Sequence, residues 1–199
     1  MKMLQDDRFP MPGFRRDNRA VAAVEFAMIL PVMLVMFFGT VEFSLGVAAN
    51  RKVTQAANTL SNLAAQSKTV GPDDMTQFFA AANEVMTPYN APPIAQRISE
   101  LHIDPTTMQA VVQWSKSSPG SSLTPRGTGD TLSVPTALAV PDTYLIFSEV
   151  SFPYNVPASI GYVVHSTMNL KDVSYARPRY SLSVRYCTDP TAQTGCTTF

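Results

Sequence analysis

An apolar block near the start of the chain constrains the fold more than any other feature. Between Glu25 and Glu42 lie 16 residues without a charge, and small or apolar residues extend the block over 21–49. A helix needs about 20 predominantly apolar residues to cross a bilayer. The two glutamates are 17 positions apart, or roughly 25 Å along a helix axis, so each could lie near one membrane interface. We therefore predict a transmembrane helix over 21–49.

The charges before the block predict its orientation. They are mostly basic: Lys2, Arg8, Arg15, Arg16 and Arg19, against Asp6, Asp7 and Asp17. An excess of Lys and Arg marks the cytoplasmic side of a membrane helix. We therefore predict a cytoplasmic basic leader over 1–20, with the rest of the chain across the membrane, in the periplasm if the cell is bacterial.

The helix is predicted to continue beyond the membrane. From Val53 to Ala64, apolar residues recur with a period close to 3.6 opposite a polar face, which predicts an extension of the helix over 50–70. The Ala-rich stripe is expected to pack on the chain's own domain, on other subunits, or on both. Pro31 lies inside the apolar block and predicts a kink or a local break, because proline lacks the N–H that a helix interior uses.

The remaining residues, 71–199, predict a small periplasmic domain. An apolar face over 73–89 predicts a short second helix packed on a sheet, with Asp73 or Asp74 as its cap. Alternating or apolar patterns predict strands at 100–104, 108–116, 143–154 and 180–187. The stretch 115–141 is rich in Ser, Gly, Thr and Pro and predicts a long exposed loop for mobility or partner contact. The expected fold class is α+β, with a long N-terminal helix leading into an antiparallel sheet.

The two cysteines, Cys187 and Cys196, lie nine positions apart near the C-terminus. Both would lie on the non-cytoplasmic side of the membrane, where disulfides persist, and we predict that they are bonded. Two free thiols in a reducing cytosol would contradict the predicted topology. Without nearby histidines, the pair makes a poor metal site.

Other features exclude several functional classes. Basic and acidic residues both number 15, without a basic stripe, so no nucleic-acid partner is expected. The only histidines, His102 and His165, lie far apart, and the sequence contains no HExxH, GxSxG, Walker A, CxxC or GxGxxG motif. We expect no enzyme activity, no catalytic residues, no cofactor and no metal.

One stretch is specific enough to indicate a family. Residues 19–47 read RAVAAVEFAMILPVMLVMFFGTVEFSLGV. This resembles the N-terminal signature of TadE/TadG-like proteins, the minor pilin-like components (pseudopilins) of the tight-adherence (Flp) type IV pilus. The matching elements are the preceding basic residues, Ala22-Ala23, Glu25-Phe26, Leu30-Pro31 and Glu42-Phe43.

The resemblance implies a mechanism of maturation and assembly. A prepilin peptidase would remove the leader between Ala20 and Val21, which makes Glu25 the fifth residue of the mature chain. The implied partners are this peptidase, other pilin and pseudopilin subunits, the inner-membrane Tad assembly platform and membrane lipid. Glu25 would pair with the new α-amine of Val21, in its own chain or in a neighbour, or would instead be solvated at the membrane interface.

Two alternatives to this interpretation remain at the level of sequence. The chain could be an uncleaved, single-pass anchor that carries a periplasmic scaffold domain. It could also be a secreted protein, because Val47-Ala48-Ala49 resembles a small-residue signal-peptidase site before Asn50. The leader would then be 49 residues long, well above the usual range of about 15–30.

Overall fold

The computed structural model describes residues 18–89, 94–155 and 167–197, with only the backbone at 18–20. It divides the chain into two units, Met1–Phe43 and Ser44–Phe199. The first helix, α1 (Asn18–Ala65), contributes residues to both units.

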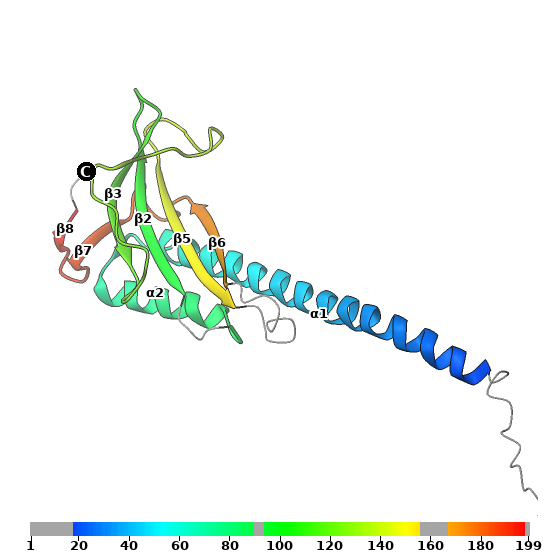
Figure 1. The fold of residues 1–199 in the computed structure, drawn as a ribbon. Coiled ribbons are helices and arrows are strands. Elements are labelled where there is room, and N and C mark those ends of the chain that lie inside the picture. The colour runs from blue at the N-terminus through cyan, green and yellow to red at the C-terminus, as the bar shows by residue number, and fades with distance from the viewer. Residues whose placement is uncertain (1–17, 90–93, 156–166, 198–199) are drawn as a thin grey trace, which may run out of the picture. The chain divides into compact units, whose positions relative to one another are not determined.

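The second unit contains one further helix and two sheets. Its elements after α1 are β1 (Thr69–Val70), α2 (Pro72–Val85), β2 (Ala95–Ile103), β3 (Ala110–Ser117), β4 (Thr131–Leu132), β5 (Tyr144–Asn155), β6 (Thr167–Ala176), β7 (Arg185–Asp189) and β8 (Thr194–Cys196). The main sheet is antiparallel with the order β4-β3-β2-β5-β6, and a small sheet has the order β1-β7-β8. The prediction of an α+β fold is confirmed (Figure 1).

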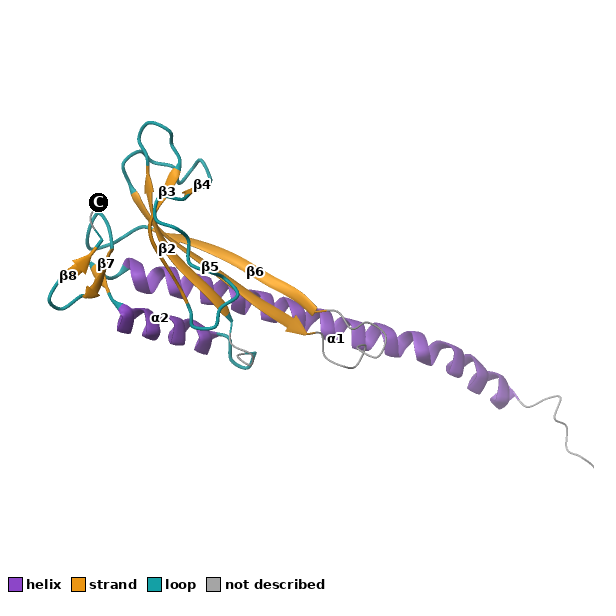
Figure 2. Ribbon diagram, turned by 60° about the vertical axis from the view of Figure 1, so that its left-hand side comes forward, coloured by secondary structure: helices purple, strands orange, loops and turns teal. Residues whose placement is uncertain are grey.

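The second half of α1 and α2 lie side by side on one face of the main sheet (Figures 1 and 2). The Ala-rich stripe of α1 is fully buried at Val53, Ala57 and Leu60, in one core with Phe79 of α2 and Ile98 of β2. Small side chains let the helix backbone approach the sheet closely. The expected packing of this stripe on the chain's own domain is therefore confirmed.

Polar contacts run along the same seam between α1 and the sheet. The Ser148 hydroxyl donates to the carbonyl of Ala57 at 2.7 Å, and the hydroxyls of Ser61 and Ser174 lie 2.9 Å apart. Thr54 donates to the carboxylate of Asp172 on β6. Because buried polar groups are costly unless paired, these contacts fix the register of α1 against the strands.

The opposite face of the sheet is covered by the segment between β3 and β5. Leu132, Val134 and Leu138 of this segment pack on a second buried cluster that includes Leu101 and Phe147. The segment between β3 and β5 is also held by polar contacts with Glu149 of β5. The Glu149 carboxylate accepts two hydrogen bonds from Arg97, at 2.6 and 2.9 Å, and two from Arg126, at 2.6 and 3.0 Å. Most residues of the predicted loop 115–141 are exposed, as expected, but its half-buried apolar side chains and Arg126 hold it on the sheet, and it contains the end of β3 and all of β4.

Several element boundaries differ from the sequence prediction, and the strand predicted at 100–104 already begins at Ala95. Helix α1 ends at Ala65, so the predicted extension over 50–70 includes Thr69–Val70, which instead pairs with β7 as a parallel strand. The strand predicted at 180–187 begins only at Arg185, because the preceding residues form a loop anchored where the Arg179 N–H donates to the Ala65 carbonyl. The predicted second helix ends at Val85.

The N-cap of α2 also differs from the prediction. The cap is Gly71, with Pro72 as the first helical residue. The carboxylate of Asp74 accepts the Gly71 N–H at 2.8 Å, so Asp74 supports the helix start from inside the first turn.

Candidate functional site

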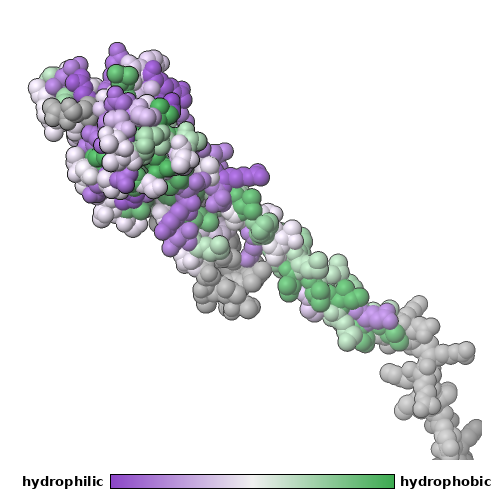
Figure 3. All heavy atoms as spheres, turned by 90° about the horizontal axis from the view of Figure 1, so that it is seen from above, coloured by the Kyte–Doolittle hydropathy of each residue, from purple (hydrophilic) through white to green (hydrophobic). Residues whose placement is uncertain are grey.

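The candidate site is the first unit's part of α1, whose apolar side chains face outward. Phe26, Met28 and Phe43 expose 60%, 74% and 74% of their surface. The most apolar 18-residue window has a mean hydropathy of 2.4, and none of it is buried. Figure 3 shows this surface as hydrophobic along the helix. A core helix of a soluble domain would bury such residues, so this part of α1 has the composition, length and exposure of a membrane span.

The predicted processing site lies at the start of this segment. Both Ala20 and Val21 fall within α1, and the leader residues 1–17 lie outside the described part of the chain. Val21 exposes 57% of its surface. The structure therefore places the Ala20–Val21 bond in the first turn of the helix.

Glu25 lies four residues after Val21 and is exposed on the same helix face. Its neighbours Val24, Phe26 and Ile29 are apolar and exposed. Among the residues that the structure describes, Glu25 forms no ion pair with a Lys or Arg side chain. A carboxylate among apolar side chains is costly in lipid unless a cation pairs with it. Glu25 is therefore suited to bind a cation that is not a side chain of its own helix.

Pro31 lies inside α1, and the helix continues through it without a break. Of the two outcomes expected at this position, a local break is therefore absent, and a kink stays a prediction. The adjacent side chains, Leu30 and Val32, are exposed.

Cys187 and Cys196 are joined by a disulfide, as predicted. The bond connects β7 to β8 at a directly paired position of the small sheet. Cys187 is fully buried. The bond closes the turn at the end of the chain and holds the small sheet together.

A buried carboxylate that the sequence did not single out lies between the two sheets. Glu100 of β2 is fully buried, and its Oε1 accepts the N–H of Val184 at 2.5 Å. The indole N–H of Trp114, the direct partner of Glu100 on β3, donates to the Val184 carbonyl at 2.6 Å. Two side chains thus hold both backbone groups of Val184, as a neighbouring strand would.

The surroundings of Glu100 change its ionisation. Burial raises the pKa of Glu100 to about 8, while hydrogen bonding to Val184 and Trp114 opposes the rise. Its Oε2 atom has no hydrogen-bond partner among the described residues. At neutral pH the group is therefore mainly a neutral acid. In the sequence, only the position of Glu100 in an apolar strand indicated that it is buried. Its contact with Val184, 84 positions away, could not be predicted from any sequence pattern.

Within 18–89, 94–155 and 167–197, no three His, Cys, Asp or Glu side chains gather as a metal site would require. His102 lies 3.1 Å from the exposed carboxylate of Asp142, and its ring faces Tyr144. His165 lies outside the described residues.

Comparison with known protein families gave one match. Residues 20–60 match the family model of TadE-like proteins. This range includes Ala20, Val21, Glu25 and Pro31 and extends into the buried half of α1. Comparisons with curated proteins and with solved structures each gave no match. The resemblance predicted from the N-terminal segment is thereby confirmed for residues 20–60.

Proposed function

We propose that this chain is a non-enzymatic, minor pilin-like component of the tight-adherence type IV pilus in bacteria. It is held in the inner membrane by residues 21–43 of α1, fewer than the 21–49 expected from the sequence because Ala49 is buried in the domain core, with a cytoplasmic N-terminus and a periplasmic domain. A prepilin peptidase removes its leader between Ala20 and Val21. Its other partners are pilin and pseudopilin subunits, the inner-membrane assembly platform and lipid.

The observation that carries the proposal is the match of residues 20–60 to the TadE-like family, on a helix with an exposed apolar surface. Bonded cysteines in the second unit are consistent with a periplasmic location, because the cytosol keeps thiols reduced. The family is one of structural pilus components, which accords with a role in assembly rather than catalysis.

Glu25 is the residue to which we assign subunit pairing in the membrane. Leader removal would create an α-amine at Val21, one helical turn before Glu25. In lipid, pairing of this amine with Glu25 of the same or a neighbouring chain would offset the cost of a buried charge. Such a pair would set the stagger of adjacent helices.

The two alternatives differ from this proposal in the N-terminus of the mature protein. An uncleaved anchor would keep Met1. A secreted form cut after Ala49 would lose the exposed segment, but it would also remove Ala49, which is fully buried in the domain core. The cut would divide α1 four residues before Val53, which is buried in the same core. The loss of part of this packed helix argues against the secreted form.

The experiment is substitution of Glu25 by Ala in the native host, with piliation and leader removal both measured. We expect Glu25→Ala to leave leader removal largely intact and to reduce the yield of sheared pili. Glu84→Ala, at an exposed acidic position of α2, is the matched control and should leave both unchanged. Normal piliation by Glu25→Ala would contradict the pairing role.

A further inference from the structure

A loop on the second unit presents two apolar side chains to solvent. Residues 177–183, which we name the recognition loop, connect β6 to β7. Leu182 exposes 89% of its surface and Tyr180 exposes 67%. Leu182 has the highest exposure among the large apolar side chains that the structure describes, and Tyr is enriched among residues that dominate interfaces.

The loop is fixed at both ends. At its start, the Arg179 N–H donates to the Ala65 carbonyl at 2.9 Å and the guanidinium donates to Asn62 at 2.9 Å. Within it, the Ser181 hydroxyl donates to the Ser183 carbonyl at 2.6 Å. At its end, Val184 is held by Glu100 and Trp114. A loop that is ordered before binding loses little entropy on binding, which favours a role in recognition.

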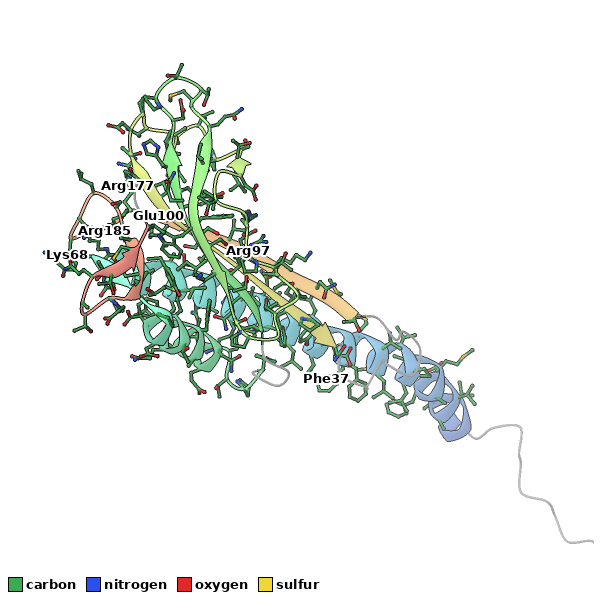
Figure 4. The ribbon with its side chains drawn as sticks, turned by 90° about the vertical axis from the view of Figure 1, so that its left-hand side faces the viewer. Phe37, Lys68, Arg97, Glu100, Arg177 and Arg185 are labelled. Carbon is green, nitrogen blue, oxygen red and sulfur yellow. A yellow bond between two sulfur atoms is a disulfide. The ribbon has the colours of Figure 1, made fainter. Side chains whose placement is uncertain are left out.

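Basic side chains surround this loop. Lys68, Arg177 and Arg185 are exposed and gather at the same end of the second unit (Figure 4). The Arg185 N–H donates to the Lys68 carbonyl at 3.2 Å, which ties two of the three segments together. Among the described residues, no acidic side chain forms an ion pair with any of the three. The partner of the recognition loop therefore needs an apolar recess with acidic surroundings.

The same chain carries such a recess. A groove of about 480 Å³ lies beside β4, and its apolar lining comes from Met108, Leu132, Val134 and Ala139. We name it the β4 groove. The residues that line it, at 108–109 and 131–139, carry no charge, and Arg126, five positions before Thr131, is bound to Glu149. The acids next to these residues are Asp130 and Asp142, which are exposed, and Asp104, which is partly exposed. Hydrogen bonds from the N–H groups of Thr107 and Thr106 lower the pKa of Asp104, which keeps it charged.

We propose that the recognition loop of one copy docks in the β4 groove of a second copy. Leu182 and Tyr180 fill the groove, while Lys68, Arg177 and Arg185 face its acidic surroundings. No residue of the loop lines the groove of its own chain. Because the two surfaces differ, the contact is head-to-tail, and each copy keeps one surface free for a further copy. The contact lies in the second unit and does not depend on Glu25 or on leader removal.

The test is crosslinking between two populations of the full-length chain mixed in liposomes. One population carries Leu182→Cys and the other carries Thr136→Cys, at an exposed position that lines the groove. The native cysteines are bonded to each other and do not react with a bismaleimide. We expect a crosslinked heterodimer in several-fold higher yield than for Leu182→Cys mixed with Gln77→Cys, at an exposed position of α2.

Charge variants make the test specific. Adding Arg185→Glu to the Leu182→Cys copy should lower the yield several-fold, and adding Ser133→Lys to the groove copy should restore it, since Ser133 is exposed in the groove. Equal yields for the groove pair and the Gln77 control would overturn the proposal. It would also be overturned if Arg185→Glu left the yield unchanged, or if anionic lipid alone shielded Leu182→Cys from maleimide without crosslinking. The N-terminal mass of the same samples reports processing separately.

Discussion

The two halves of α1 differ in what stabilises them. In the second half, Val53, Ala57 and Leu60 have no exposed surface and pack on the sheet and on α2. In the first half, Val24, Ile29 and Leu34 expose 60%, 54% and 45% of their surface. The second half is therefore stabilised by its own domain, whereas the first needs a lipid bilayer or other chains. The sequence already distinguishes the halves, because the second has a narrow apolar stripe opposite a polar face and the first is a continuous apolar block.

The largest expected effect concerns a buried group of the domain, Glu100. Its pKa rises from 4.5 to about 8 on folding, so the folded state holds the proton more tightly than the unfolded chain. The associated stability is fully present below pH 4.5 and is lost as pH rises toward 8. The upper bound is about 5 kcal/mol, at roughly 1.4 kcal/mol per pKa unit.

Glu100→Gln should flatten this dependence, because an amide oxygen can still accept the Val184 N–H. The measurement is chemical denaturation of the full chain in detergent between pH 5 and 9. An unchanged slope of stability against pH in the variant would contradict a buried, protonated Glu100. Exposed Glu84→Gln is the control and should leave the slope as it is.

The second prediction separates the two halves of α1 by the same substitution. Leu60→Ala should lower the free energy of unfolding of the domain by about 2–5 kcal/mol, because it leaves a cavity in the core. Leu34→Ala, in the exposed half, should leave that free energy unchanged in detergent. Equal destabilisation by both variants would show that the two halves belong to one core.

The third prediction tests the membrane role of the exposed half. Leu34→Arg places a charge near the middle of the apolar block and should disfavour membrane insertion by about 2.5–3.5 kcal/mol. Carbonate extraction of host membranes would then release more of the variant than of the unmodified chain. The control is Thr76→Arg, at an exposed position of α2, which should not change extraction. If Thr76→Arg also increased release, extraction would not measure the membrane insertion of α1.

The smallest expected effect concerns the disulfide. Replacing Cys187 and Cys196 together by Ala should lower the stability of the domain by about 2–3 kcal/mol, because the unfolded chain regains the entropy of the small loop. The small sheet should lose protection from hydrogen exchange, while β2 and β5 keep theirs. Loss of protection across the main sheet would mean that the bond supports the whole domain.

Some elements were predictable because their patterns arise from one buried face. The stripe of α1 falls in this class. Strand β5 and the hairpin of β2 and β3 are buried on both faces instead, and they were predictable as apolar runs bounded by turn residues. The bonded cysteines followed from their spacing and the predicted compartment. The TadE-like segment was recognisable because a glutamate at the start of an apolar helix is unusual.

Strand β6 was not predicted, and its contacts explain why. Asp172 and Ser174 lie on the strand face that meets α1, where they bond to Thr54 and Asn58. Polar residues on the buried side remove the alternation that marks a strand. The extended strand predicted before Arg185 was wrong for a related reason, because Tyr180 and Leu182 alternate with serines but point to solvent.

We propose that the exposed half of α1 is a processed, membrane-embedded assembly segment. The most direct test is the intact mass, with N-terminal sequencing, of the protein recovered from membranes of its native host. We predict a mature chain that begins at Val21. A chain that begins at Met1 would contradict processing and leave an uncleaved anchor, and one that begins at Asn50 would contradict the assembly role of α1 altogether.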